Sequence, residues 1–179
     1  MRVIAGEARG VPLAAPRGKG TRPITDKVKE TLFGILGDRV PDARVLDLYA
    51  GSGAIGIEAL SRGAASATFV ERGREAARVI GANLERTHLA ERAEVHATDV
   101  MRFLASAPRE ASYELALLDP PYEERAILAP LERLVPLLAP GATVVVKHFW
   151  RTEVPSPEGL SPWRERRFGE TTLTFLEVR

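Results

Sequence analysis

An apolar run that opens into a glycine-rich turn constrains the fold of this chain more than any other feature. Residues 45–48 have the mainly aliphatic character of a buried parallel strand, and residues 55–60 have the apolar spacing of a helix. Between them, Gly51 and Gly53 lack a Cβ, so the backbone can adopt positive φ and approach a ligand closely at the helix N-terminus. The stretch therefore predicts a strand, a turn and a helix that bind a nucleotide.

The residues around this turn discriminate between nucleotide classes. A P-loop needs a lysine at the end of the turn. This turn has no lysine there, which excludes P-loop kinases and ATPases. Gly51, Gly53 and Gly56 do fit the G-x-G-x-x-G fingerprint of dinucleotide-binding proteins. Asp47, however, lies four residues before the first glycine, where a carboxylate can meet the ammonium group of S-adenosylmethionine, which a pyrophosphate cofactor lacks. Glu71, 18 residues after Gly53, stands where an acid hydrogen-bonds ribose hydroxyls, so the pattern favours S-adenosylmethionine over an α/β crossover with mere surface acids.

Length and composition are those of a soluble protein with one domain and at most a small appendage. The chain has 179 residues, of which 45% are hydrophobic and 27% charged. No stretch approaches the roughly 18 apolar residues of a membrane span, and residues 1–5 are too short for a signal peptide. We therefore expect a cytoplasmic protein with no membrane partner.

The scarcity of cysteine and histidine excludes several chemistries. The chain has no cysteine, which removes disulfides, thiolate zinc sites and a cysteine nucleophile, and makes cytosine C5 methylation improbable. The three histidines do not share a metal-ligand spacing, so we expect no metal site.

Positive charge gathers at the N-terminus. Residues 1–30 hold seven basic and three acidic side chains, a balance of +4, so the remainder carries −3 of the net charge of +1. A basic end on a near-neutral body is typical of a protein with a phosphate-rich partner, although a solvated terminal arm would have the same charge.

Apolar runs and amphipathic stretches alternate along the chain, which predicts an α/β fold with a mainly parallel, seven-stranded sheet covered on both faces. An N-terminal hairpin over 2–13, a loop over 14–22 and a helix over 25–37 that Thr25 caps would form a small extension of residues 1–40. Residues 41–179 would form the catalytic domain. It would contain strands near 44–49, 67–71, 93–97, 114–118 and 142–147, helices near 53–62, 74–87, 99–106 and 124–138, and a C-terminal antiparallel hairpin of 163–168 and 171–178.

One acid follows each of four predicted strands. These acids are Asp47, Glu71, Asp99 and Asp119. Because the carboxyl ends of parallel strands meet at one edge of the sheet, where such folds bind ligands, we expect these side chains to line a single site.

The segment Asp119-Pro120-Pro121-Tyr122 after the fourth strand is suited to hold an amine. The prolines fix φ and donate no amide hydrogen, so the turn presents carbonyl groups and a carboxylate, which accept hydrogen bonds from an NH₂ group. Tyr122 offers a flat face on which a planar ring can stack. The alternative is a Pro-Pro turn that merely ends a strand.

These motifs carry a resemblance to known proteins. Residues 47–53 with 119–122 resemble the class I S-adenosylmethionine-dependent methyltransferases that act on exocyclic amino groups. Residues 2–10, 22–33 and 46–63 are similar to the bacterial 16S ribosomal RNA guanine-N2 methyltransferase family, RsmD. The resemblance implies a Rossmann-like class I methyltransferase fold, a monomer, and methylation of one guanine in 16S ribosomal RNA, either naked or in a partly assembled small subunit.

The resemblance also implies roles for individual residues. In the cofactor site, Glu71 would bind the ribose and Asp99 the adenine edge. Arg22 and Thr25 would order the segment that closes over the site. The residues that would hold the cofactor are Asp47, Ala50, Gly51, Ser52, Gly53, Glu71, Asp99, Arg22 and Thr25. The target guanine would be held by Asp119, Pro120, Pro121 and Tyr122. Two positions depart from the family pattern: Lys147 stands where a glutamate is common, and Gly73 where a polar side chain is common. Lys147 therefore receives no role.

Several rival functions share parts of this pattern. Adenine-N6 methyltransferases of DNA or RNA and protein-glutamine methyltransferases use a similar turn, but a DNA enzyme normally carries a separate recognition domain, and the glutamine enzymes typically have asparagine at the position of Asp119. An NAD oxidoreductase would need a proton-transfer pair, and none stands out. A non-catalytic nucleotide-binding module remains the alternative from a different class.

Overall fold

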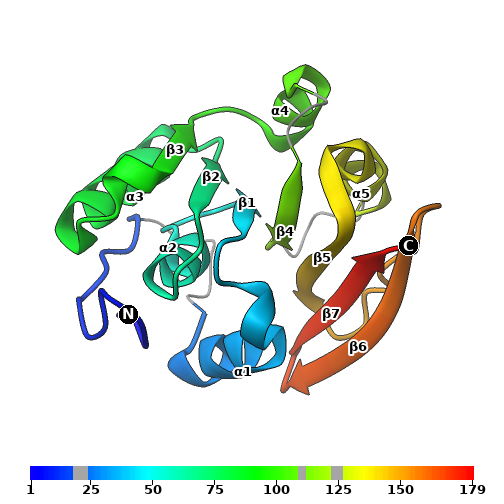
Figure 1. Ribbon diagram of the computed structural model, residues 1–179, viewed down its shortest axis with the longest axis horizontal. Helices are drawn as coiled ribbons and strands as arrows, with labels where there is room; N and C mark the ends of the chain where they lie inside the picture. Colours follow the sequence, from blue (N-terminus) through cyan, green and yellow to red (C-terminus); the bar gives the residue numbers. More distant parts are fainter. Residues whose placement is uncertain (18–23, 109–111, 122–126) are drawn as a thin grey trace.

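The computed structural model describes residues 1–17, 24–108, 112–121 and 127–179. The predicted site residues Arg22 and Tyr122 lie outside these ranges. The described residues form one seven-stranded sheet in the order β3-β2-β1-β4-β5-β7-β6, shown in Figure 1. The strands are β1 (Arg44–Leu48), β2 (Ser66–Val70), β3 (Ala93–His96), β4 (Tyr113–Leu118), β5 (Leu138–Phe149), β6 (Leu160–Phe168) and β7 (Thr171–Val178).

The sheet is parallel except at its C-terminal end, as predicted. Each of the pairs that link β3, β2, β1, β4 and β5 is parallel, whereas β7 pairs antiparallel with both β5 and β6. The helices are α1 (Asp26–Leu36), α2 (Ala54–Ser61), α3 (Arg74–Thr87), α4 (Val100–Ser106) and α5 (Leu128–Leu134), with 3₁₀ turns at Gly37–Arg39, Ala90–Arg92 and Val135–Leu137.

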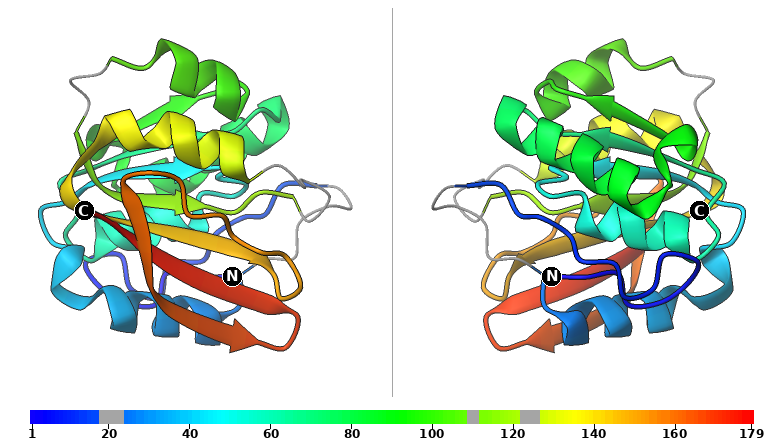
Figure 2. Two further views of the ribbon diagram at one scale, coloured as in Figure 1. Left: turned by 90° about the vertical axis from the view of Figure 1, so that its right-hand side faces the viewer. Right: turned by 90° about the vertical axis from the view of Figure 1, so that its left-hand side faces the viewer.

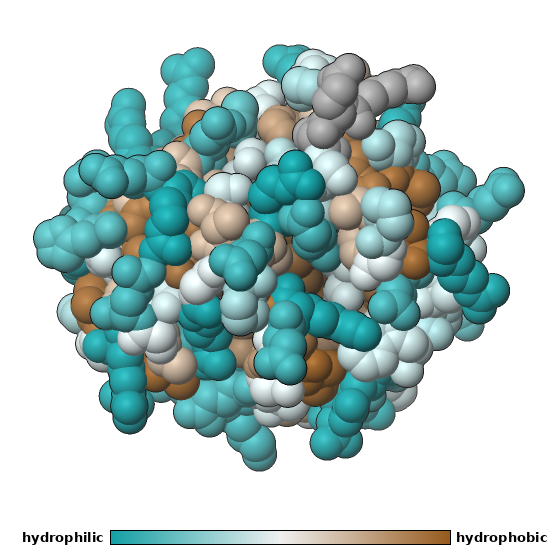
Figure 3. Space-filling view, in the orientation of Figure 1, coloured by the Kyte–Doolittle hydropathy of each residue, from teal (hydrophilic) through white to brown (hydrophobic). Residues whose placement is uncertain are grey.

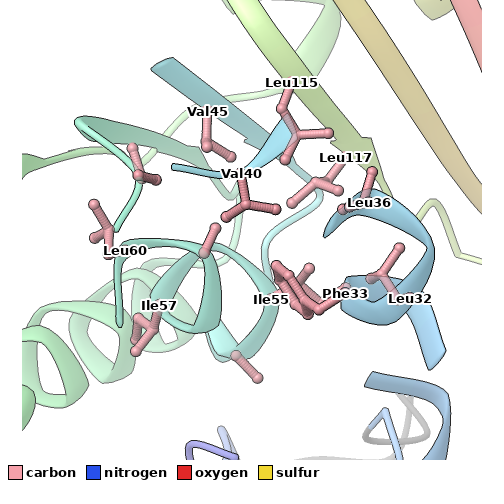
Figure 4. Close-up of a cluster of buried hydrophobic side chains, with 14 of the residues drawn as sticks. Leu32, Phe33, Leu36, Val40, Val45, Ile55, Ile57, Leu60, Leu115 and Leu117 are labelled. Atoms are coloured by element: carbon pink, nitrogen blue, oxygen red, sulfur yellow. The ribbon is translucent and has the colours of Figure 1, made fainter. Parts of the chain in front are cut away.

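Alternating strand residues divide the core into two layers. Val45 and Leu117 point to one face, where they pack with side chains of α1, α2 and α3. Leu46 and Leu118, their sequence neighbours, point to the other face and pack with α4 and α5. Figure 4 shows the first layer, in which side chains of α1 meet those of α2 beneath β1 and β4. In Figure 2, α4 and α5 lie on one side of the sheet and α1 on the other.

Three predicted elements were wrong in extent, and one of them is the strand expected over 163–168, because β6 begins at Leu160. The helix expected over 124–138 is shorter within the described residues, because α5 covers Leu128–Leu134 and a 3₁₀ turn with Pro136 follows before β5 begins at Leu138. Pro136 has no N–H group to continue a helical ladder. The strand expected over 142–147 is longer, because β5 spans Leu138–Phe149 and pairs with β4 on one side and β7 on the other.

The N-terminal hairpin forms without regular strands. In the described part of this segment, one antiparallel bridge joins Arg2 and Pro12. A main-chain hydrogen bond from Val3 N to Val11 O at 3.0 Å also crosses the hairpin. Two other amides are directed to α2: Ile4 N donates to Glu58 at 2.9 Å, and Ala8 N donates to Ser61 Oγ at 2.9 Å. The segment is therefore an irregular hairpin held on α2.

Glu58 is the centre of this attachment. Its side chain is fully buried and accepts hydrogen bonds from Ile4 N, from Ala5 N at 3.0 Å and from Arg62 Nε at 2.8 Å. Lys29 of α1, also fully buried, places its Nζ 3.2 Å from Glu58 Oε2. One carboxylate thus joins the N-terminal segment, α1 and α2.

Candidate active site

The turn between β1 and α2 has the backbone conformation that its glycines permit. Gly51 and Gly53 have φ of 57° and 77°, and Tyr49 has a φ of 60°, which is uncommon for a residue with a side chain. A Cβ added at Gly51 would have no neighbour within 4 Å, so the turn borders open space there. Gly56 is required for a different reason: a Cβ at this position would lie 2.4 Å from the Phe69 ring. The third glycine of the fingerprint therefore serves helix-to-sheet packing.

Asp47 lies at the end of β1, beneath this turn. Its carboxylate is 2% exposed and accepts a hydrogen bond from Gly56 N at 3.0 Å. Burial raises the pKa of Asp47 well above its usual range, the Gly56 N–H group opposes the rise, and the charges of Asp119 and Glu71 add to it. The structure therefore places Asp47 against the N-terminus of α2, and its contact with a ligand's ammonium group stays a prediction.

Glu71 joins the end of β2 to the same turn. Its Oε2 accepts a hydrogen bond from Gly51 N at 2.9 Å, and its Oε1 accepts one from Gly73 N at 2.7 Å. A Cβ at Gly73 would lie 3.1 Å from Glu71 Oε1, so the small residue at this position leaves room for the carboxylate. Glu71 is thus fixed beside the open side of the turn, with further lone pairs for a ligand's hydroxyl groups.

Glu71→Ala is expected to weaken cofactor binding while leaving the fold intact. The change removes charge-assisted hydrogen bonds of roughly 1.5–3 kcal/mol, which corresponds to about a 10- to 150-fold rise in Kd. Calorimetric titration with S-adenosylmethionine measures the change, and Glu75→Ala in the first turn of α3 provides a control for an acid of the neighbouring helix. An unchanged Kd in Glu71→Ala would remove this residue from the site.

Asp99 and Thr25 lie at helix N-termini and are exposed. Asp99 caps α4 and accepts a hydrogen bond from Arg102 N at 3.2 Å. Thr25 caps α1, as predicted, and accepts one from Val28 N at 3.3 Å. Their roles toward the cofactor stay predictions, since their contacts in the structure are those of helix caps.

Asp119 follows β4 and lies beside the end of β1. Its backbone N donates to Leu48 O at 3.3 Å, and its side chain is 28% exposed. Lys147 of β5 places its Nζ 2.7 Å and 2.8 Å from the two carboxylate oxygens. Burial raises the pKa of Asp119 above its ordinary value, and the Lys147 charge and hydrogen bonds oppose the rise. Of the two prolines that follow, Pro120 is buried and Pro121 half-buried.

The strand order brings these acids to the point where ligands bind in open α/β sheets. The chain runs outward from β1 to β2 and β3 in one direction and continues through β4 and β5 in the other, so the sheet changes direction between β1 and β4. Asp47 and Asp119 end these two strands, and Glu71 ends the neighbouring β2. The site therefore opens at the carboxyl edge beside α2. A hollow on the molecule that Arg39, Glu114 and Thr143 line lies at the opposite edge and does not involve these acids.

Two residues of the site were missed by the sequence analysis. Lys147 is one, and the signal for it was a charged residue that ends an apolar strand parallel to that of Asp119. Asn83 of α3 is the other: fully buried, it accepts a hydrogen bond from Ala14 N at 2.8 Å and donates to Ala14 O and Ser52 O, each at 3.0 Å. It holds the N-terminal segment beside the glycine-rich turn.

The strand order and the final antiparallel strands define the class I methyltransferase fold. The solved structure described as "Putative methyltransferase yhhF from Escherichia coli" superposes with a TM-score of 0.86 and 34% identity, covering 99% of this chain and 97% of that one.

Sequence comparisons give the family. The profile of the family described as "Conserved hypothetical protein 95" matches residues 1–177. The Bacillus subtilis protein named "Putative rRNA methyltransferase YlbH" is 39% identical over 183 residues, which cover 100% of both chains. The "Ribosomal RNA small subunit methyltransferase D" of Haemophilus influenzae is 34% identical over 174 residues, covering 94% of this chain and 89% of that one. This chain belongs to the conserved hypothetical protein 95 family, together with YlbH and RsmD.

Within the described ranges, none of the helices has the length and apolar character to cross a membrane. The same residues contain no cluster of three or more histidine and acidic side chains that could hold a metal ion.

Proposed function

We propose that this protein transfers a methyl group from S-adenosylmethionine to the exocyclic N2 of a guanine in 16S ribosomal RNA. The observation that carries the proposal is the Asp119 carboxylate at the switch point of the sheet, next to Asp47 and across from the glycine-rich turn that Glu71 holds. The names of YlbH and of the RsmD proteins support ribosomal RNA as the substrate class.

The described residues fit the cofactor. The open space beside Gly51 admits a ligand close to the backbone, and the fixed Glu71 carboxylate suits ribose hydroxyls. When bound, the cofactor supplies a sulfonium methyl group. Asp119 would accept a hydrogen bond from the guanine amine, because the nitrogen becomes more acidic as it forms its bond to the methyl carbon.

The transfer balances without another reagent. The N2–carbon bond forms as the sulfur–carbon bond breaks, S-adenosylhomocysteine leaves as a neutral thioether, and N2 loses one proton. An ionised Asp119 would accept that proton and pass it to water.

The substrate-facing surface is proposed to include the extension of residues 1–40. Val3 and Leu32 of this extension pack in the same core cluster as Phe69, so its described part is joined firmly to the catalytic domain. Figure 3 shows hydrophilic side chains over much of one face of the molecule, with hydrophobic areas small and separated. We propose that RNA binding relies on charge and on base stacking.

The proposal is tested with the purified protein, methyl-labelled S-adenosylmethionine and 16S ribosomal RNA, either free or in small-subunit particles. Digestion to nucleosides should recover the label as N2-methylguanosine, and S-adenosylhomocysteine, unlike NAD, should raise the melting temperature. Label in N6-methyladenosine would instead favour the rival amino-methyltransferase. Cofactor binding without transfer to either RNA substrate would favour a non-catalytic module.

Replacing Arg17 and Lys19 with alanine is expected to flatten the salt dependence of RNA binding. Arg17 is exposed at the end of the described N-terminal segment, and Lys19 lies outside the described residues. Each lost phosphate contact should remove about 0.7–0.9 from the slope of log affinity against log salt concentration. Arg133→Ala, on an exposed position of α5 beyond the opposite face of the sheet, is the control. A slope equal to that of the wild type would show that the arm is only a solvated tail.

A further inference from the structure

The ion pair of Asp119 and Lys147 fixes the orientation of the Asp119 carboxylate. One ammonium group lies within 2.8 Å of both carboxylate oxygens, which orients the plane of the carboxylate as well as its charge. The Lys147 side chain is 9% exposed, whereas that of Asp119 is 28% exposed. The lysine is therefore the inner partner, and the carboxylate is the partner that faces the open edge of the sheet.

The register of the sheet explains why the two side chains meet. Leu118 of β4 is opposite Val146 of β5 in a parallel pair, so the next residues of the two strands, Asp119 and Lys147, lie side by side. On its other side, Lys147 is opposite Leu173 of β7, which is 1% exposed. The aliphatic part of the lysine is thus largely buried, and its Nζ meets the Asp119 carboxylate.

We propose that Lys147 is a positioning residue that keeps the Asp119 carboxylate ionised and fixes its orientation toward the target amine. This inference rests on the proposed function, in which Asp119 accepts a hydrogen bond from the guanine amine and then its proton. Lys147 acts through Asp119. Each carboxylate oxygen retains a lone pair for a substrate N–H group while it accepts from the ammonium group.

The charges around Asp119 determine the sign of the effect. Lys147 on β5 favours the ionised form of Asp119, whereas burial disfavours it. The charge of Asp119 in turn raises the pKa of the neighbouring Asp47 on β1, as does that of Glu71 on β2. Loss of the lysine charge leaves the effect of burial unopposed, so the pKa of Asp119 must rise. Methyl transfer requires the ionised carboxylate. When the pKa of Asp119 rises, acidification therefore abolishes transfer at a higher pH than in the wild-type protein.

Lys147→Met removes the charge but retains an unbranched apolar side chain, and Lys147→Arg retains the charge. The rate of single-turnover methyl transfer is measured against pH at saturating cofactor. In Lys147→Met, the pH at which the rate falls on acidification should rise by about one to three units, the usual effect of losing an adjacent opposite charge. Lys147→Arg should restore this pH toward the wild-type value, and the Kd for S-adenosylmethionine should change little in either variant. If Lys147→Met does not fold, Lys147→Gln is used in its place, because it also removes the charge.

A titration that needs no substrate separates this inference from the proposed function. The ¹³C carboxyl resonance of Asp119, identified by its loss in Asp119→Asn, should titrate at higher pH in Lys147→Met than in the wild type. Lys27→Met, a change at an exposed lysine of α1, should leave it unmoved. Equal titration of Asp119 in Lys147→Met and wild-type protein would overturn the role of Lys147, whereas a wild-type protein that methylates no ribosomal RNA would overturn the proposed function alone.

Discussion

Asp119→Ala is expected to slow the methyl-transfer step by about 10²- to 10³-fold, the loss typical of removing one hydrogen-bonding group aimed at developing charge. The carboxylate ends β4 at the switch point of the sheet, where the Lys147 ammonium group fixes both of its oxygens. Its interaction with the guanine amine strengthens as the nitrogen becomes more acidic in the transition state, so the loss should appear in the rate and not in cofactor affinity.

Single-turnover methylation at saturating S-adenosylmethionine isolates this step, provided that the affinity for RNA is measured alongside. Asp119→Asn keeps the shape and one acceptor oxygen without the charge, and should transfer at a rate between those of alanine and wild type. Asp99→Ala, which removes another acid at the same edge, should alter cofactor affinity and not the rate at saturation. Full-rate transfer by Asp119→Ala would end the assignment of this turn to the target amine.

Glu58→Ala is expected to lower the free energy of unfolding by about 3–5 kcal/mol, as when one member of a buried ion pair is removed. The change would leave Lys29 buried and without its carboxylate, and would also leave the amides of Ile4 and Ala5 without their acceptor. The effect combines an unpaired charge with unsatisfied backbone donors, both of which are costly in a protein interior.

Denaturant unfolding followed by circular dichroism measures this loss. Glu85→Ala is a matched control, because Glu85 is an exposed glutamate of the neighbouring α3 and surface changes of this kind stay within about 0.5 kcal/mol. If Glu58→Ala were no more destabilised than Glu85→Ala, the network that joins the N-terminal segment to α2 would not contribute to stability as described.

The sheet could be predicted from sequence because its signal is local. Residues 45–48 and 114–118 are short apolar runs, each followed by a turn and a helical pattern, and parallel strands between two helical layers produce that alternation. The same regularity places Asp47, Glu71 and Asp119 at one edge before any coordinates are known, since Asp47 lies near the end of a strand and the other two acids directly follow one.

Features that depend on pairing across the sheet could not be predicted in this way. The contact of Lys147 with Asp119 follows from the register of β4 and β5, which neither strand specifies alone. Glu58 and Asn83 are polar residues of helices that are fully buried, and their partners in the N-terminal segment lie more than 50 residues away in sequence, so neither helix specifies these contacts alone. Gly56 fits a ligand-binding fingerprint, yet the Phe69 ring beside it shows that packing requires the glycine.

Mapping the methylated bases of 16S ribosomal RNA from cells that lack this protein tests whether it is a guanine-N2 methyltransferase. One guanine should lose its N2-methyl group in the deletion strain. The wild-type protein should restore that group, and Asp119→Ala should not. Ribosomal RNA with the same methylation in the deletion and parent strains, or a loss confined to adenine N6, would rule out guanine-N2 methylation by this protein.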